Sequence, residues 1–93
     1  MKQVRAHVLI EGRVQGVCYR IDARRAALER NLTGMVRNLP GGKVEAVFEG
    51  EDSDVKSMLK WCETGPPLAR VTKVEVEWKP YTGEFEGLEI RFV

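Results

Sequence analysis

Several features that would place this chain in a broad functional class are missing from its sequence. No apolar stretch approaches the roughly twenty residues that a membrane-spanning helix needs, so we expect no membrane association. Residues 1–7 are charged and lack an apolar run of signal-peptide length, which predicts a cytoplasmic protein. The 15 Lys and Arg residues nearly balance 14 Asp and Glu, and the net charge of +1 provides no global field for nucleic acid. Any preference for an anion must therefore be local.

Metal-binding side chains are equally scarce. The chain has 2 cysteines, Cys18 and Cys62, without C-x-x-C spacing, and 1 histidine, His7. The sequence therefore predicts neither a metal site nor metal-dependent chemistry. Because His7 lies in a strand-like run with no second potential ligand nearby in sequence, we interpret it as a surface strand residue.

The length and the apolar alternation predict one small sheet-containing domain. A chain of 93 residues can bury one core and leaves no room for a second, so residues 1–93 are predicted to form a single domain. Pro40, Gly41 and Gly42 form a turn-like set that reads as a hairpin. Strand-like patterns occur over residues 4–12, 35–39, 43–49 and 71–79, and around Leu88, Ile90 and Phe92.

Two segments have helical character. Residues 21–31 are rich in alanine, arginine and leucine and have a plausible stop at Asn31, but Leu28 falls away from the alanines and the apolar stripe is weak. Asp52 and Ser53 are possible caps of the second helix. Its apolar residues recur at i, i+3, i+4 and i+7, namely at Val55, Met58, Leu59 and Cys62.

The predicted element order is strand, helix, strand, strand, helix, strand, with a short strand appended. This order is typical of the α+β, ferredoxin-like split β-α-β sandwich, an antiparallel sheet with two helices on one face. In this topology the loop of residues 12–20, Asn38 and Cys62 all lie at one end of the molecule. Asn38 is therefore expected to face the loop, although no local motif marks it.

The loop of residues 12–20 has the layout of a phosphate cradle. Glycine lets main-chain N–H groups approach an anion closely, and a helix N-terminus leaves such donors unpaired and partially positive. Arg20 adds a fixed planar cation at the expected helix start. The run reads Gly12, Arg13, Val14, Gln15, Gly16, Val17, Cys18, Tyr19 and Arg20.

Two stretches of the chain resemble the signatures of the acylphosphatase family, whose members hydrolyse the mixed anhydride of a carboxylic acid and phosphate. The first stretch is residues 12–20 and the second is residues 34–45, continuing to Gly50. The resemblance implies that Arg20 is catalytic and binds the phosphoryl group, and that Asn38 positions the attacking water. It also implies phosphate binding by main-chain N–H groups of Gln15, Gly16, Val17, Cys18, Tyr19 and Arg20.

The same resemblance implies a small acyl phosphate substrate, no metal or other cofactor, and competitive inhibition by the product, inorganic phosphate. Phosphoryl transfer mainly requires charge stabilisation and an aligned nucleophile, which a cradle and one polar side chain supply. Asn38 can orient water but cannot take its proton at neutral pH. We expect a monomer, because charged residues along 71–79 protect that exposed strand edge.

Cys18 lies in the cradle, where open N–H groups and Arg20 favour its thiolate. A nucleophilic cysteine needs an activating partner, and His7 is placed in a strand body, so we do not assign covalent catalysis to Cys18. Because Cys62 is expected at the same end, a Cys18–Cys62 disulfide is geometrically allowed, although a reducing cytosol argues against it.

Two other functions compete with hydrolysis. The first is a module on the same fold that holds phosphate or a carbamoyl-phosphate-like ligand without turnover; acylphosphatase-like domains do occur inside larger maturation proteins. The second is an RNA-recognition module, which shares the element order but needs exposed aromatic residues on its central strands. Here the open faces of residues 4–12 and 43–49 carry charged and aliphatic residues, so we expect no RNA binding.

Overall fold

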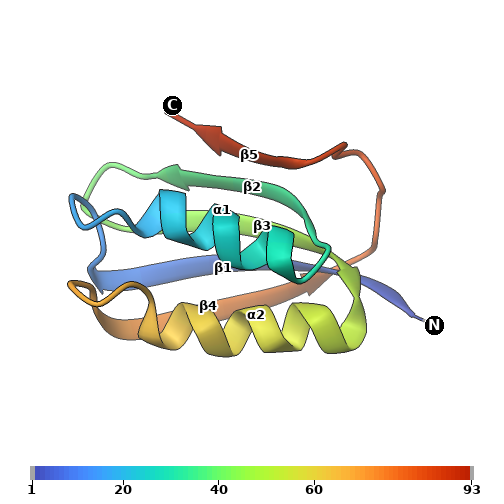
Figure 1. Ribbon diagram of the computed structural model, residues 1–93, viewed down its shortest axis with the longest axis horizontal. Coiled ribbons are helices and arrows are strands. Elements are labelled where there is room, and N and C mark those ends of the chain that lie inside the picture. Colours follow the sequence, from blue (N-terminus) through green and yellow to red (C-terminus); the bar gives the residue numbers. More distant parts are fainter. Residues whose placement is uncertain (1, 93) are drawn as a thin grey trace.

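A computed structural model describes residues 2–92, which form five strands and two helices (Figure 1). The strands make one sheet in the order β4-β1-β3-β2-β5, and both helices cover the same face. The ferredoxin-like α+β arrangement predicted from the sequence is confirmed. The elements are β1 (Gln3–Arg13), α1 (Tyr19–Glu29), β2 (Thr33–Asn38), β3 (Val44–Glu51), α2 (Asp52–Thr64), β4 (Arg70–Lys79) and β5 (Leu88–Arg91).

The prediction of a wholly antiparallel sheet is wrong at its last strand. β5 pairs in parallel with β2, with Gly34 opposite Leu88 and Val36 opposite Ile90, whereas the other neighbouring strands are antiparallel. The reason is topological. Residues 80–87 carry the chain once from one edge of the sheet to the other, so β5 runs opposite to β4 and therefore in the same direction as β2.

The alternating patterns predicted the buried face correctly. On β1, Ala6, Val8 and Ile10 are fully buried, and on β3 the buried set includes Val44, Ala46 and Phe48. The predicted stripe of α2 packs onto them through Val55, Met58 and Cys62, with Leu59 partly buried at the margin. This close-packed core holds the sheet and α2 together and so fixes the positions at which the loops begin and end.

Helix α1 begins and ends two residues earlier than predicted. Its end is set by Asn31, which adopts a left-handed φ of 58°, and the N–H groups of Asn31 and Leu32 bond back to the Leu28 and Ala27 carbonyls. Asn31 is therefore the stop, as the sequence indicated, but lies outside the helix. The expected weak stripe is confirmed, because the buried residues of α1 include small alanines whereas Leu28 is exposed.

Strand β4 is an edge strand with less burial than its pattern indicates. Val74, Val76 and Trp78 lie on the helix-covered face, since they pair with Ile10, Val8 and Ala6. Val76 and Trp78 nevertheless remain exposed, because they lie at the sheet margin. Among residues 2–92, no helix is long and apolar enough to cross a membrane.

The uncovered face of the sheet is lined with charged pairs. Nε2 of His7 lies 2.8 Å from Oε2 of Glu45, so His7 is partly buried and paired rather than a simple surface residue. Burial favours a higher pKa for Glu45, but hydrogen bonds from His7 and Arg37 lower that pKa below its ordinary value. Glu49 is buried and accepts hydrogen bonds from Arg5 and from the Thr82 N–H, which fastens residues 80–87 to the sheet.

Three connections meet at one end of the sheet. Figure 1 shows the loop between β1 and α1, the β2–β3 turn and the α2–β4 loop at the same end. This convergence is the one predicted from topology. It brings the start of α1 next to Asn38 of β2, with which Arg20 shares a cavity, and next to the last turn of α2, to which Tyr19 is hydrogen-bonded.

Tyr19, the first residue of α1, anchors this end to α2. Its ring is buried, lies 5.5 Å from the Trp61 ring, and its hydroxyl donates a 2.8 Å hydrogen bond to the Cys62 carbonyl oxygen. Burial raises the pKa of Tyr19 far above its ordinary value, so the hydroxyl stays protonated and remains a donor. The start of α1 is thereby held by a side chain that points away from solvent.

Tyr19→Phe tests this anchor. The substitution leaves a carbonyl of α2 without its partner and is expected to lower the free energy of unfolding by about 1 kcal/mol. For a chain of this size that corresponds to a fall in Tm of roughly 4–8 °C. Tyr81→Phe, at an exposed tyrosine, is the matched control and is expected to unfold like the wild type. An equal Tm for the two variants would show that the hydrogen bond contributes nothing.

Candidate active site

The loop of residues 14–18 bends through two left-handed residues. Gly16 has φ of 75° and Cys18 has φ of 63°. A Cβ at residue 16 would meet nothing within 4 Å, so glycine serves the backbone conformation there rather than a close contact. Cys18 is the N-cap of α1 without a side-chain capping bond, so the left-handed turn itself directs the chain into the helix.

The backbone N–H groups of this bend are available as donors. Within residues 2–92, no backbone hydrogen bond of normal geometry is donated by the N–H groups of residues 15–20, and the first such bond of α1 runs from Asp22 to the Cys18 carbonyl. Unpaired donors at a helix start carry partial positive charge and bind anions. The loop therefore presents a cluster of donors without a backbone partner of normal geometry among the described residues.

Arg20 stands in the first turn of α1 and reaches the last residues of the chain. Its Nη1 donates a long, 3.4 Å hydrogen bond to the Arg91 carbonyl oxygen, and its guanidinium carbon lies 5.0 Å from the centre of the Phe92 ring. A cation over an aromatic face is attracted by the ring's electron density. The end of β5 thus steadies the guanidinium, and no carboxylate among the described residues pairs with it.

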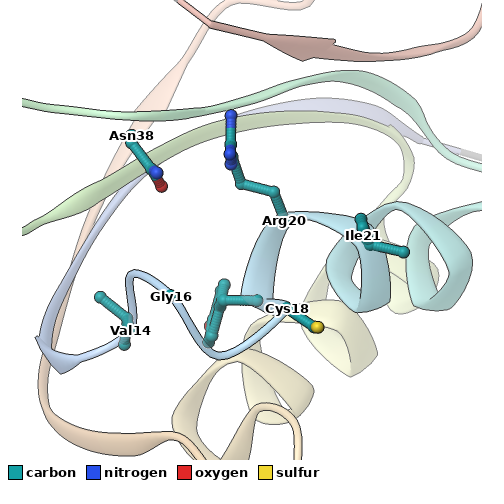
Figure 2. Close-up of a pocket in the computed structure, with 7 residues that line it drawn as sticks. Val14, Gly16, Cys18, Arg20, Ile21 and Asn38 are labelled. Atoms are coloured by element: carbon teal, nitrogen blue, oxygen red, sulfur yellow. The ribbon is translucent and has the colours of Figure 1, made fainter.

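Asn38 closes the site from β2. Figure 2 shows its carboxamide and the Arg20 side chain projecting to the same side of the loop, toward a shared space. That space is a cavity of about 300 Å³ lined by Val14, Gly16, Cys18, Tyr19, Arg20, Ile21 and Asn38. Oδ1 of Asn38 is buried, yet it accepts no hydrogen bond from any residue in the described part of the chain. A buried carbonyl oxygen without a partner is costly and points to a ligand or solvent donor.

Gln15 ties the loop to the turn that follows Asn38. Its side-chain Nε2 donates two hydrogen bonds of 2.8 Å, to the backbone oxygens of Leu39 and Lys43. The N–H of Leu39 also bonds to the Lys43 oxygen, which closes the β2–β3 turn. The position of Asn38 relative to the loop is therefore set by a cross-link from the loop itself.

The cavity contains most, but not all, of the predicted site residues. Arg20, Asn38, Gly16, Cys18 and Tyr19 line it, whereas Gln15 points to the β2–β3 turn and the Val17 side chain is buried in the core. Gln15 and Val17 can therefore offer an anion their backbone N–H groups but not their side chains. Sequence reasoning missed the lining residues Val14 and Ile21, which lie within or beside the motif, and Phe92, which no local pattern links to Arg20.

The two cysteines are free thiols. Cys18 is exposed, and its sulfur points away from Asn38 (Figure 2). Cys62 is fully buried, and burial raises the pKa of its thiol to about 12. The disulfide that topology allowed is therefore absent, because the two sulfurs lie in opposite environments, one in solvent and one in the core.

Comparisons with known proteins point to one family. A family model described as Acylphosphatase matches residues 6–90. An acylphosphatase of Pelotomaculum thermopropionicum is 49% identical over 92 residues, which cover 99% of this chain and 100% of the relative. The solved structure of an acylphosphatase from Coxiella burnetii superposes with a TM-score of 0.90 at 36% identity, over 96% of this chain and 93% of that one.

A similar fold also occurs within a much larger protein. The structure of HypF from T. kodakarensis matches with a TM-score of 0.82 at 32% identity, over 95% of this chain. The matched part is 12% of the HypF chain. The fold is therefore found both as a chain of this length and as a small part of a long one.

The contrast between the two cysteines predicts their reactivity. Native protein treated with excess iodoacetamide at pH 8 without reductant is expected to gain one carbamidomethyl group, at Cys18, and two after unfolding in guanidinium. The masses of the intact protein measure both numbers. Native Cys18→Ser is expected to gain none. No label on the unfolded wild type would reveal a disulfide, and rapid double labelling of the native protein would show that Cys62 is not sequestered.

Proposed function

The chain belongs to the acylphosphatase family, and from this premise we propose that its cavity at the start of α1 hydrolyses small acyl phosphates to a carboxylate and inorganic phosphate. One observation carries the assignment of the site. Unpaired N–H donors, the Arg20 guanidinium and the unpartnered Oδ1 of Asn38 border a single cavity. A tetrahedral dianion beside an aligned water satisfies all three.

In this proposal the loop and Arg20 hold the phosphoryl group. N–H groups of residues 15–20 point to its equatorial oxygens, where charge is concentrated in the transition state, and the guanidinium supplies a planar pair of donors. Because Arg91 and Phe92 already steady Arg20, little side-chain freedom is lost on binding. The cradle is preorganised for the charge that develops during transfer.

Asn38 positions the nucleophile. Its Oδ1 accepts a hydrogen bond from water, whose oxygen attacks phosphorus on the side opposite the acyl oxygen. The bond between phosphorus and the acyl oxygen breaks, and its electron pair leaves with the carboxylate. The proton of the attacking water passes to a phosphoryl oxygen. A carboxylate is a good leaving group, so this scheme needs neither a strong protein base nor a metal.

The alternative function is a phosphate-holding module without turnover. The match to a small part of HypF shows that the fold also occurs inside a longer chain, as this alternative requires, whereas the match to the full length of the Pelotomaculum acylphosphatase supports the enzyme. Benzoyl phosphate separates them. A module would bind inorganic phosphate in calorimetry and leave benzoyl phosphate intact at the background rate.

We further propose a cytoplasmic monomer. Its two free thiols fit a reducing compartment. The edge strand β4 carries exposed ion pairs, Lys73 with Glu75 at 2.7 Å and Lys79 with Glu77 at 3.0 Å, which disfavour pairing with the β4 of another copy.

Arg20→Ala and Asn38→Ala are expected to separate binding from turnover. Each removes a group worth roughly 3–4 kcal/mol of barrier, so kcat/KM falls about a hundredfold or more in both. Inorganic phosphate is expected to inhibit the wild type competitively and Asn38→Ala with a similar inhibition constant, but Arg20→Ala far more weakly. Benzoyl phosphate assays with EDTA present throughout measure all three, and EDTA itself is expected to change no rate. If Asn38→Ala keeps a turnover near that of the wild type, Asn38 does not position the attacking water.

Gln15→Met is expected to lower kcat about tenfold with little change in KM. The methionine has similar volume but cannot donate to Leu39 and Lys43, and neutral hydrogen bonds contribute about 1 kcal/mol each. The backbone N–H of residue 15 remains, so phosphate inhibition is expected to persist. Gln3→Met, at an exposed position of β1, is the matched control. A rise in KM at constant kcat would place Gln15 in binding instead of in positioning Asn38.

A further inference from the structure

A second hollow continues from the catalytic cavity along α1. It has a volume of about 490 Å³ and lies between α1 and the edge strand β5, lined by Ile21, Arg24, Arg25, Leu28, Glu29 and Ile90. Ile21 lines both spaces, and 57% of its surface is exposed. The two hollows therefore adjoin at the exposed Ile21 side chain. We name the second one the α1–β5 groove.

Along α1 the groove has aliphatic residues on either side of a basic middle. Ile21, Leu28 and Ile90 supply aliphatic surface, and Arg24 lies one helical turn beyond Arg20, on the same side of α1. Nε of Arg24 donates a 2.9 Å hydrogen bond to the Leu88 carbonyl oxygen, which fixes the side chain against β5. No carboxylate within residues 2–92 forms an ion pair with Arg24, although Arg25 approaches Asp22 at 3.8 Å.

The charges also limit the length of a ligand in this groove. The guanidinium of Arg20 is held at Arg91 and that of Arg24 at Leu88, three residues away on β5, so the two cations lie roughly 10 Å apart. Glu29 lies farther along the groove and repels an anion. A chain of four or five carbons that starts at the phosphoryl group therefore places a terminal carboxylate near Arg24. A longer chain would bring that carboxylate toward Glu29.

We infer that the α1–β5 groove binds the acyl part of the substrate and that Arg24 selects acyl phosphates with a carboxylate at the far end of a short chain. The inference rests on the proposed function, because it takes the phosphoryl group to lie in the cradle beside Arg20. Ile21 contacts the first carbons of the acyl chain, and the anchored guanidinium of Arg24 pairs with the distal carboxylate.

Two substrates of equal chain length test the inference. Succinyl phosphate carries a terminal carboxylate, and butyryl phosphate ends in a methyl group. The wild type is expected to hydrolyse succinyl phosphate with a kcat/KM about three- to fivefold higher at low salt, the range of a partly exposed ion pair. The preference is expected to fade in 1 M salt, where the screening length is about 3 Å.

The ratio of the two kcat/KM values is measured on each preparation, so incomplete folding of a variant cancels. The ratio is expected to fall to about one in Arg24→Gln and below one in Arg24→Glu, which repels the carboxylate. Lys60→Gln, at an exposed residue of α2, removes one positive charge elsewhere and is expected to keep the wild-type ratio. A ratio of one in the wild type, or equal ratios in the wild type and both Arg24 variants, overturns the inference.

Acetyl phosphate, which has no distal group, distinguishes a failure of the inference about the groove from a failure of the proposed function. If the wild type hydrolyses acetyl phosphate but does not distinguish succinyl from butyryl phosphate, the groove is wrongly assigned and the proposed function stands. If it hydrolyses none of the three, the proposed function fails and the inference fails with it.

Discussion

The left-handed bend at Gly16 and Cys18 is the constraint on which the site depends. It turns the chain from β1 into α1 while the N–H groups of residues 15–20 donate no backbone hydrogen bond of normal geometry within the described part of the chain, so these donors remain available at the helix start. Its N–H donors carry no formal charge, and the cation that faces them, Arg20, belongs to the same loop. That agrees with a chain whose overall charge is close to zero.

The rest of the molecule holds this bend in place. Tyr19 ties its helical side to α2 through the Cys62 carbonyl, and Gln15 ties its loop side to the turn after Asn38. The end of β5 steadies Arg20. Each of these contacts joins segments distant in sequence, so the loop donors that we propose to bind the anion keep a fixed separation from the Asn38 amide that we propose to orient water. A reaction that needs little covalent participation from the protein depends on such fixed geometry.

Much of this could be predicted from the sequence. Period-two alternation gave the buried face of β1 and β3, and the i, i+3, i+4, i+7 spacing gave α2, because these patterns follow directly from backbone geometry. Topology alone brought Asn38 to the cradle. The parallel pairing of β5 was not predicted, because it depends on how residues 80–87 cross the sheet. The contacts of Gln15 and Phe92 have no local signature, since they join side chains to segments far away in the chain.

We infer that the groove beyond Ile21 binds the acyl group, as the loop is proposed to bind the phosphoryl group. In our proposal the cradle contacts only the phosphoryl group, so discrimination among acyl groups requires contacts farther along α1 and β5. A crystal structure of the protein soaked in inorganic phosphate tests the central claim most directly. We predict tetrahedral density between the N–H groups of residues 15–20 and the Arg20 guanidinium, with the Asn38 carboxamide facing it. Phosphate bound elsewhere, with the cradle unoccupied at saturating concentration, would contradict the account.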